Sequence, residues 1–191
     1  MLIAIEGADQ LGKSTQTELL CEALCVRKHK ATVEKIPYED GVTKKRIYEM
    51  LFDGTAPKFP IVFQTMQGLN RRHFQLTYLP TLASHYDVIV LDRWSLSTRV
   101  YGAASGVPEE TTQVILEDLV PPDLTLVLDG EPFPWEGQDS YEGDRTFQEK
   151  VRRGYQEYCA RWPESFVKID ANRPREIVHE DLLTHALLAL R

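Results

Sequence analysis

Residues Ile3-Ala4-Ile5-Glu6-Gly7-Ala8-Asp9-Gln10-Leu11-Gly12-Lys13-Ser14-Thr15 decide the fold of this chain. The apolar run that opens this stretch predicts a buried strand, and the spacing G-x-x-x-x-G-K-[ST] that follows is that of a phosphate-binding P-loop. Gly7 and Gly12 let the backbone curl so that successive N–H groups point at phosphate oxygens, next to the positive N-terminus of a helix. We expect Lys13 to reach the outer phosphates and the Ser14 hydroxyl to bind magnesium. The alternative is an ordinary strand-turn-helix with chance glycines, and the position of the motif at a strand-to-helix junction argues against it.

Composition argues against several classes of protein. The chain has 191 residues and a formal net charge of −7, which argues against a protein that coats nucleic acid. No apolar run approaches the roughly 20 residues of a membrane span, and the first strand leaves no room for a signal peptide, so we expect no membrane contact and a cytoplasmic location, in the cell of origin or in a host. Three cysteines do not suggest a disulfide framework. With 42% hydrophobic residues, the chain can bury one good core, and we expect one domain over residues 1–191.

Strands and helices are predicted to alternate along the sequence. Continuous apolar runs are typical of strands that are buried on both faces of a parallel sheet. The alternation predicts an α/β fold with a five-stranded parallel sheet flanked by helices, in which ligands bind at the carboxyl ends of the strands. A segment rich in Pro, Gly and acidic residues, about 130–143, is expected to form a short lid loop. The expected strands are 2–5, 31–36, 87–91, 124–128 and 166–169, and the expected helices are about 13–27, 43–52, 61 into the seventies, two more that begin after Trp94 and at Pro108, 147–161 and 173–190.

A second charged motif, Asp92-Arg93-Trp94-Ser95-Leu96-Ser97-Thr98-Arg99-Val100-Tyr101, follows the strand expected at 87–91. An acid–base pair at a strand end can be a structural salt bridge. Beside a P-loop, an arginine in that place can instead hold a phosphate with its planar, forked guanidinium group.

Taken together, the motifs resemble the thymidylate kinase family. The resemblance rests on E-G-x-D-x-x-G-K-S-T-Q, D-R-[aromatic]-x-x-S-x-x-x-Y, P-D-L-T-L-x-L-D, Y-E…F-Q…V and I-D-A-x-R-P, and it extends from Ile3 to Val178. The P-loop alone is common to many nucleotide-binding proteins, whereas D-R-W-S-L-S-T-R-V-Y and I-D-A-N-R-P are far more specific in combination. The resemblance implies a P-loop NTPase fold, ATP and Mg²⁺ as cofactors, a deoxynucleoside monophosphate, first of all dTMP, as substrate, and a homodimer.

The resemblance also implies roles for particular residues. The phosphates and adenine of ATP would contact Gly7, Ala8, Asp9, Gln10, Leu11, Gly12, Lys13, Ser14, Thr15, Asp170, Ala171 and Arg173. The monophosphate substrate would contact Asp9, Lys35, Gln67, Arg71, Arg93, Ser97, Thr98, Tyr101 and Tyr141. Magnesium and its waters would be organised by Ser14, Asp92 and Glu142, and the transferred phosphoryl group by Lys13, Asp92 and Arg93.

The substrate contacts divide among sugar, phosphate and base. By the resemblance, Asp9 would accept a hydrogen bond from the 3′-hydroxyl, and Tyr101 would pack under the deoxyribose and disfavour a 2′-hydroxyl. Lys35 stands where the family usually has Arg and would face the acceptor phosphate together with Arg93. Arg71 would donate to O4 of the base, which favours thymine or uracil over cytosine.

One departure from the family pattern concerns the clamp on the transferred phosphate. Gln10 and Ser140 stand where family members carry arginine, and the loop 131–138 holds no basic residue. Arg145 follows this loop, near the start of the next helix, and we expect it to be the replacement cation for the transition state. The alternative is a solvated helix residue, since surface charges usually contribute little.

The other departure concerns the base. Gln67 stands where an aromatic residue normally stacks on thymine. An amide cannot replace a stacked ring, but it can bond a polar 5-substituent such as hydroxymethyl, so that a modified pyrimidine is an alternative substrate. If Phe63 or Phe74 supplies an aromatic surface instead, Gln67 is only a spacer.

Three classes of function therefore remain in view. The first is a kinase for dTMP, and the second is a related kinase for dUMP or a 5-substituted dUMP. The third is a nucleotide-binding module or weak ATPase, which the joint presence of Lys13, Ser14 and Asp92-Arg93 disfavours. The sequence has no Asn-Lys-x-Asp motif for guanine, which argues against a GTPase switch.

Overall fold

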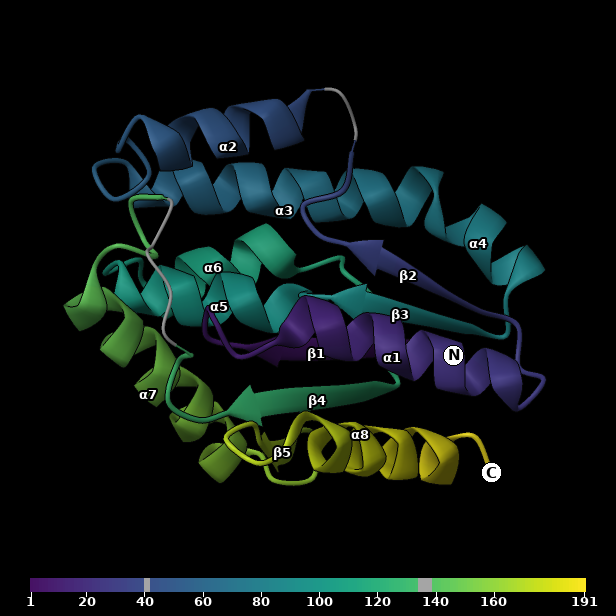
Figure 1. Ribbon diagram of the computed structural model, residues 1–191. Helices are drawn as coiled ribbons and strands as arrows, with labels where there is room; N and C mark the ends of the chain where they lie inside the picture. The colour runs from purple at the N-terminus through teal and green to yellow at the C-terminus, as the bar shows by residue number, and fades with distance from the viewer. Residues whose placement is uncertain (40–41, 134–138) are drawn as a thin grey trace.

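The computed structural model describes residues 1–39, 42–133 and 139–191, and its centre is a sheet of five parallel strands (Figure 1). The strand order is β2-β3-β1-β4-β5, so the P-loop strand is central. The predicted α/β fold with a five-stranded parallel sheet is confirmed. The strands are β1 (Leu2–Gly7), β2 (Ala31–Lys35), β3 (Val88–Asp92), β4 (Leu124–Asp129) and β5 (Val167–Asp170).

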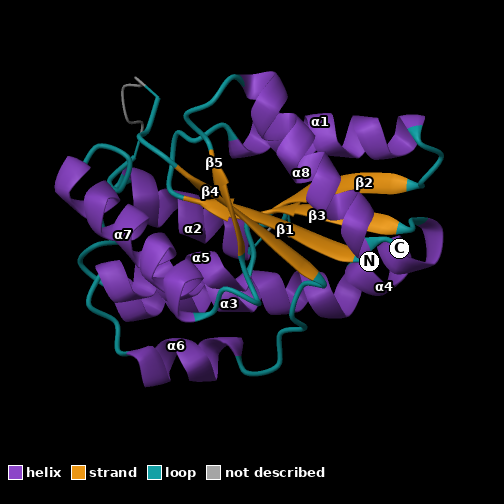
Figure 2. Ribbon diagram, turned by 90° about the horizontal axis from the view of Figure 1, so that it is seen from below, coloured by secondary structure: helices purple, strands orange, loops and turns teal. Residues whose placement is uncertain are grey.

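Helices cover both faces of this sheet (Figure 2). Helices α1 and α8 pack together on one face, and α4, α5 and α7 lie against the strands on the other. Helix α3 packs on α5, α2 packs on α3, and α6 packs on both α3 and α5. The helices are α1 (Lys13–Val26), α2 (Thr43–Phe52), α3 (Pro60–Thr77), α4 (Leu79–His85), α5 (Ser95–Ala104), α6 (Glu109–Leu116), α7 (Arg145–Arg161) and α8 (Arg175–Ala189).

Alternate residues of β1 face opposite sides of the sheet, as the two-residue period of a strand requires. Ile3 and Ile5 belong to the larger apolar core, whereas Leu2 and Ala4 belong to a smaller cluster with Trp94. Because β1 is buried on both faces, the loop that follows it is anchored firmly at its first residue.

Local signals set the helix boundaries. Helix α7 begins at Arg145, about two residues earlier than expected, because the Asp144 carboxylate caps it by accepting a hydrogen bond from the Phe147 amide at 3.0 Å. Helix α8 begins after Pro174, so Arg173 lies in the preceding loop. Of the expected lid at 130–143, residues 134–138 lie outside the described part of the chain.

The strand ends gather the charged motifs at one edge of the sheet. In the register of the sheet, Ile5 pairs with Asp92, Gly7 with Leu128, and Asp129 with Asp170. The carboxyl ends of β1, β3 and β4 therefore lie side by side, as expected for the ligand site of a parallel sheet. Across the described residues, no helix is both long and apolar enough to cross a membrane.

Candidate active site

The P-loop turns from β1 into α1 with the backbone that its glycines allow. Gly7 has φ 140° and Gly12 has φ 76°, and a Cβ atom on Gly7 would lie 2.5 Å from the Leu128 carbonyl oxygen. The Lys13 ammonium is buried and donates to the Ala8 carbonyl at 2.5 Å, so the side chain folds back over the loop. Ser14 stays exposed at the first turn of α1, where an anion would meet the helix N-terminus.

Ser14 and Asp92 place oxygen ligands beside the P-loop. The Ser14 hydroxyl donates to Asp92 Oδ2 at 2.7 Å, while Asp92 Oδ1 is buried and has no hydrogen-bond partner among the described residues. No cluster of three or more His, Cys, Asp or Glu is present in the parts of the chain that the structure describes. Mg²⁺ in phosphoryl-transfer sites is usually held by one or two carboxylates together with substrate phosphates, so this sparse oxygen set fits it.

Arg93 connects the P-loop to α5. Its backbone has φ 72°, a left-handed conformation that is uncommon outside glycine, and its amide donates to the Ile5 carbonyl at 3.0 Å. The guanidinium Nη1 donates to the Gly7 carbonyl at 3.0 Å and the Ser97 hydroxyl at 3.1 Å. Its Nη2 pairs with Asp9 and donates to the Tyr101 hydroxyl at 3.2 Å. Strain of this kind is characteristic of functional sites.

Asp9 is the acceptor of this network. Its Oδ2 accepts from the Tyr101 hydroxyl at 2.6 Å and from Gln148 Nε2 at 3.0 Å, in addition to the ion pair with Arg93. Burial alone would raise the pKa of Asp9, but Arg93, Lys13 and the two hydrogen bonds outweigh it, and the pKa lies below its ordinary value. Asp9 is therefore a charged acceptor at neutral pH. Sequence reasoning missed Gln148, because no motif or spacing in the sequence of α7 indicates a contact with the P-loop.

Glu6 is a second carboxylate that sequence reasoning did not place in the site. Its side chain is 0% exposed and accepts from the amides of Trp94 and Ser97 at 2.8 and 3.2 Å. It also accepts from the Ser97 hydroxyl at 2.5 Å and from the Tyr155 hydroxyl at 3.0 Å. Glu6 thus fixes the first turn of α5 against the central strand.

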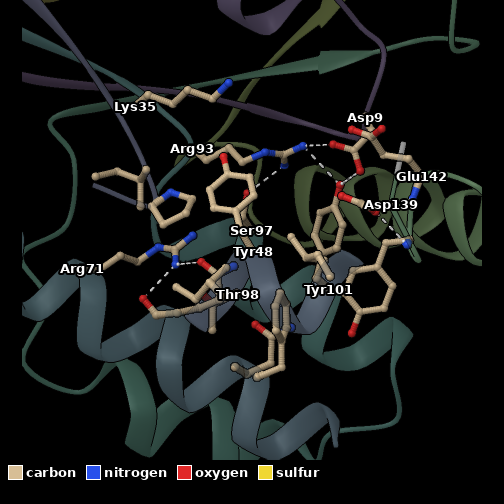
Figure 3. A pocket seen from close by; sticks show the side chains of 18 residues that line it. Asp9, Lys35, Tyr48, Arg71, Arg93, Ser97, Thr98, Tyr101, Asp139 and Glu142 are labelled. Carbon is tan, nitrogen blue, oxygen red and sulfur yellow. Dashed lines mark hydrogen bonds and ion pairs between the residues drawn. The ribbon is translucent and has the colours of Figure 1, made fainter. Parts of the chain in front are cut away.

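A cavity of about 190 Å³ opens beside Arg93, between the strand ends and helices α2, α3 and α5 (Figure 3). All the residues expected to contact the monophosphate line it, and Figure 3 shows Lys35, Arg93 and Asp9 across its upper part with Arg71 and Thr98 below. These residues are Asp9, Lys35, Gln67, Arg71, Arg93, Ser97, Thr98, Tyr101 and Tyr141; Glu142, expected near magnesium, lines the cavity as well.

The lower end of the cavity is organised around Arg71, which is only 2% exposed. Its Nε donates to the Trp94 carbonyl at 3.0 Å, and its Nη1 donates to the Gln67 carbonyl and side-chain oxygen at 3.0 and 2.9 Å. Burial lowers the pKa of Arg71 to about 10, which leaves the group charged at neutral pH. Nη2 makes no hydrogen bond to any described residue, so it is the guanidinium nitrogen left for a ligand.

The Gln67 side chain thus contacts Arg71, and its contact with a base stays a prediction. Of the two alternative aromatic residues, Phe63 lines the cavity and lies edge-on to Tyr141, with ring centroids 5.5 Å apart. Phe74 does not line it, because its ring packs into the core cluster against Trp94.

Other expected site residues lie outside this cavity. Asp170, Ala171 and Arg173 follow β5, where the Ala171 amide donates to the Asp129 carbonyl at 2.8 Å and Arg173 pairs with Asp181. Arg145 is exposed at the first position of α7 and makes no hydrogen bond or ion pair with a described residue.

Sequence reasoning missed part of the cavity wall. Tyr48 and Leu51 of α2, Gln64 of α3 and Asp139 also line the cavity. Only Gln64 carried a usable signal, because it lies three residues before Gln67 and therefore on the same helix face.

Comparison with known proteins gives a consistent result. The family model described as thymidylate kinase matches residues 5–182. The thymidylate kinase of Jannaschia sp. (strain CCS1) is 32% identical over 197 aligned residues, which cover 94% of this chain and 92% of that protein. The thymidylate kinase of Chlorobium chlorochromatii (strain CaD3) is 30% identical, with 100% and 96% covered, and that of Schizosaccharomyces pombe (strain 972) is 27% identical, with 95% and 89% covered.

Lys13 provides a test of the phosphate site by pH. Burial, and then the charge of Arg93, lower the pKa of Lys13 to about 8, so the free protein loses this charge as the pH rises through about 8. We expect the affinity for ATP, measured by calorimetry, to begin to fall between pH 7 and 8 and to fall steadily above pH 8, a range in which the phosphate groups have already lost their last proton (pKa about 6). Lys13→Arg keeps its charge and should abolish the decline. A decline of equal size in Lys13→Arg, or none in the wild type up to pH 10, would show that Lys13 is not its source.

Proposed function

Because the chain belongs to the thymidylate kinase family, we propose that it transfers the terminal phosphoryl group of ATP to a deoxynucleoside monophosphate, first of all dTMP, with release of ADP and dTDP. The observation that carries the proposal is that one cavity beside the P-loop is lined by every residue expected on the acceptor side. A protein that only binds ATP at its P-loop needs no additional cavity for an acceptor substrate beside that loop.

Positioning and charge neutralisation supply most of the catalysis in phosphoryl transfer. In the proposed reaction, Lys13 and the P-loop amides hold the phosphates of ATP, and Arg93 holds the acceptor phosphate at the other end of the transferred group. Lys35 lies at the same end of the cavity and adds a second positive charge. Asp9 and Tyr101 orient the sugar, which keeps the attacking oxygen in line with the leaving group.

Ser14 and Asp92 would hold Mg²⁺, with Glu142 on the cavity side. The buried, unpartnered Oδ1 of Asp92 supports this assignment, because a buried carboxylate oxygen without a partner calls for a cation or water. When bound, the ion neutralises charge that develops on the phosphate oxygens. The role of Ser14 and Asp92 would be to fix the position of the ion beside the P-loop.

A homodimer is part of the proposal. Val62, Leu69 and Leu76 recur every seven residues along α3 and are 54%, 49% and 69% exposed. This spacing places them on one helix face, and Val114 adds a 68% exposed apolar side chain on the neighbouring α6. A second copy would cover such a face. A cytoplasmic location and a single domain over residues 1–191 stay predictions from the sequence.

A related kinase for a pyrimidine with a polar 5-substituent is a second candidate, favoured by one observation. Gln67 gives its side-chain oxygen to Arg71, which leaves the amide nitrogen as a donor at the cavity wall. A hydroxymethyl oxygen on the base can accept from that donor, whereas the methyl group of thymine cannot.

A panel of monophosphates with ATP and magnesium tests both candidates. We expect ADP to form only when a monophosphate is added, with specificity constants for dTMP, dUMP and 5-hydroxymethyl-dUMP above those for dCMP and dGMP. ADP formation without a monophosphate would indicate an ATPase, and no ADP would indicate a binding module. A preference for the hydroxymethyl compound that is lost in Gln67→Phe would establish the second candidate, and equal rates in both proteins would reject it.

Arg93 provides a test of the acceptor end. Arg93→Ala removes charge-assisted hydrogen bonds and should weaken monophosphate binding by about tenfold or more, with ATP affinity near that of the wild type. The matched control is Arg72→Ala, which removes an arginine on α3 that pairs with Asp118 outside the cavity. Loss of ATP binding with the monophosphate retained, as measured by calorimetry, would contradict the assignment.

Arg145 provides a test of the replacement clamp. We propose that the exposed Arg145 side chain, which pairs with no described residue, neutralises the transferred phosphate, because Gln10 and Ser140 supply no cation. Arg145→Met should lower turnover by about tenfold or more while the melting temperature stays unchanged. Arg153→Met, which changes another exposed arginine of α7, is the control. A turnover within about twofold of the wild type would assign Arg145 to the solvated surface.

A further inference from the structure

Gln64 has an unusual environment on the cavity wall. It is 1% exposed, and its Nε2 has no hydrogen-bond partner among the described residues. No hydrogen bond of its Oε1 to a described residue is present either. Buried side-chain amides in native proteins nearly always have partners, and leaving one unpaired costs stability. An unpaired amide on the wall of a ligand cavity therefore points to a partner that arrives with the ligand.

A second unpaired group lies on the same wall. Thr98 is 1% exposed, and its hydroxyl oxygen has no partner among the described residues. The Gln64 side chain reaches toward α5, since its Cγ is 3.6 Å from the position a Cβ on Gly102 would take. Gly102 lies one turn after Thr98, so Gln64 and Thr98 approach the cavity from neighbouring points of the α3–α5 contact.

Gln64, Gln67 and Arg71 share one face of α3, with Arg71 about two turns after Gln64. The cavity thus carries a donor at Arg71 Nη2, a hydroxyl at Thr98 and an amide at Gln64. A hydroxyl can accept a hydrogen bond, so the three groups can together offer two donors and an acceptor to one ligand. The edge of a 2,4-dioxopyrimidine presents the complement: O4 accepts, N3–H donates and O2 accepts.

We propose that Gln64 determines base specificity by donating from Nε2 to O2 of the pyrimidine, the carbonyl across the ring from the one that faces Arg71. This assignment rests on the proposed function and deepens it. On its hydrogen-bonding edge, guanine presents an acceptor (O6) toward Arg71 and a donor (N1–H) toward Thr98, as thymine does with O4 and N3–H. The two bases differ at the group that faces Gln64, where guanine carries an amino donor and thymine the acceptor O2. Gln64 is thus the group that separates a dioxopyrimidine from guanine by hydrogen bonding.

The test uses dTMP and its 2-thio and 4-thio analogues as binding probes in calorimetry, where turnover is not needed. Sulfur is a poor acceptor, so both analogues should bind the wild type more weakly than dTMP. In Gln64→Met we expect dTMP to bind about tenfold more weakly, the penalty for 2-thio-dTMP to disappear and the penalty for 4-thio-dTMP to remain. Gln113→Met, which changes an exposed glutamine of α6, is the control and should match the wild type.

Stability provides a readout that a merely structural role would not give. Gln64→Met replaces an unpaired buried amide by an apolar chain of similar length, so the melting temperature of the free protein should rise by about 2–4 °C. A structural hydrogen bond at Gln64 would make it fall.

The proposed kinase function and the role of Gln64 are contradicted by different results. If the wild type neither binds nor phosphorylates dTMP or another uracil-type monophosphate, the proposed function is wrong. If it does, but Gln64→Met binds dTMP as tightly as the wild type or retains the 2-thio penalty, the assignment of Gln64 alone is overturned.

Discussion

The buried carboxylate of Glu6 is the interaction on which the rest of the site depends. It sits near the end of the central strand, is fully removed from solvent, and accepts four hydrogen bonds from Trp94, Ser97 and Tyr155. A buried charge with so many donors is satisfied only in one arrangement of β1, α5 and α7. The carboxylate also meets the positive N-terminus of α5, where negative charge is favourable. The first turn of α5, and with it the neighbouring Arg93, is therefore placed by a buried carboxylate that does not line the cavity.

Arg93 carries this constraint into the cavity. Its left-handed backbone is unfavourable for a side chain with a Cβ, and four hydrogen bonds to Gly7, Ser97, Asp9 and Tyr101 hold it there. The guanidinium is thus oriented before any phosphate arrives, which limits the side-chain entropy lost on binding. Asp9 balances the concentration of positive charge from Arg93 and Lys13, and its own pKa is held low by them. In the free protein, the positive charges of Arg93 and Lys13 therefore lie next to the negative charge of Asp9. A bound phosphate would accept hydrogen bonds from the Arg93 guanidinium, which pairs with Asp9 in the free protein.

The sequence was sufficient to predict the sheet and its parallel strands, because most of the strands are contiguous apolar runs. Asp9 and Arg93 also lie in contiguous motifs at strand ends, whereas the roles expected for Gln67 and Arg71 on α3 came from the family resemblance. The contacts between distant elements could not be read in this way. Gln148 reaches Asp9 from α7, 139 positions along the chain, and Tyr48 reaches the cavity from α2. Phe74 is a case in which the sequence suggested a cavity residue that the fold buries elsewhere. Its helical spacing from Arg71 is compatible with the cavity wall, but its ring packs against Trp94 in the core. Helix spacing gives the face of a helix, but the neighbour that covers this face is decided by the tertiary fold.

The base end of the cavity differs in kind from one built around an aromatic ring. Stacking binds any flat base with similar strength, so it adds affinity with little selectivity. In the proposed complex, a wall formed by Gln64, Gln67 and Arg71 would bind the base through directed donors, and each donor that a wrong base leaves unpaired would be desolvated at a cost. The Gln67 side-chain oxygen accepts from Arg71 Nη1, which leaves Nη2 without a hydrogen bond to a described residue. In the free protein, polar atoms of Gln64 and Thr98 are buried and have no partner among the described residues, which costs stability. In the proposed complex, selectivity for the base would therefore come from Gln64 and Thr98, whose unpaired polar atoms destabilise the free protein. A complementary base would pair these atoms and remove the destabilisation on binding.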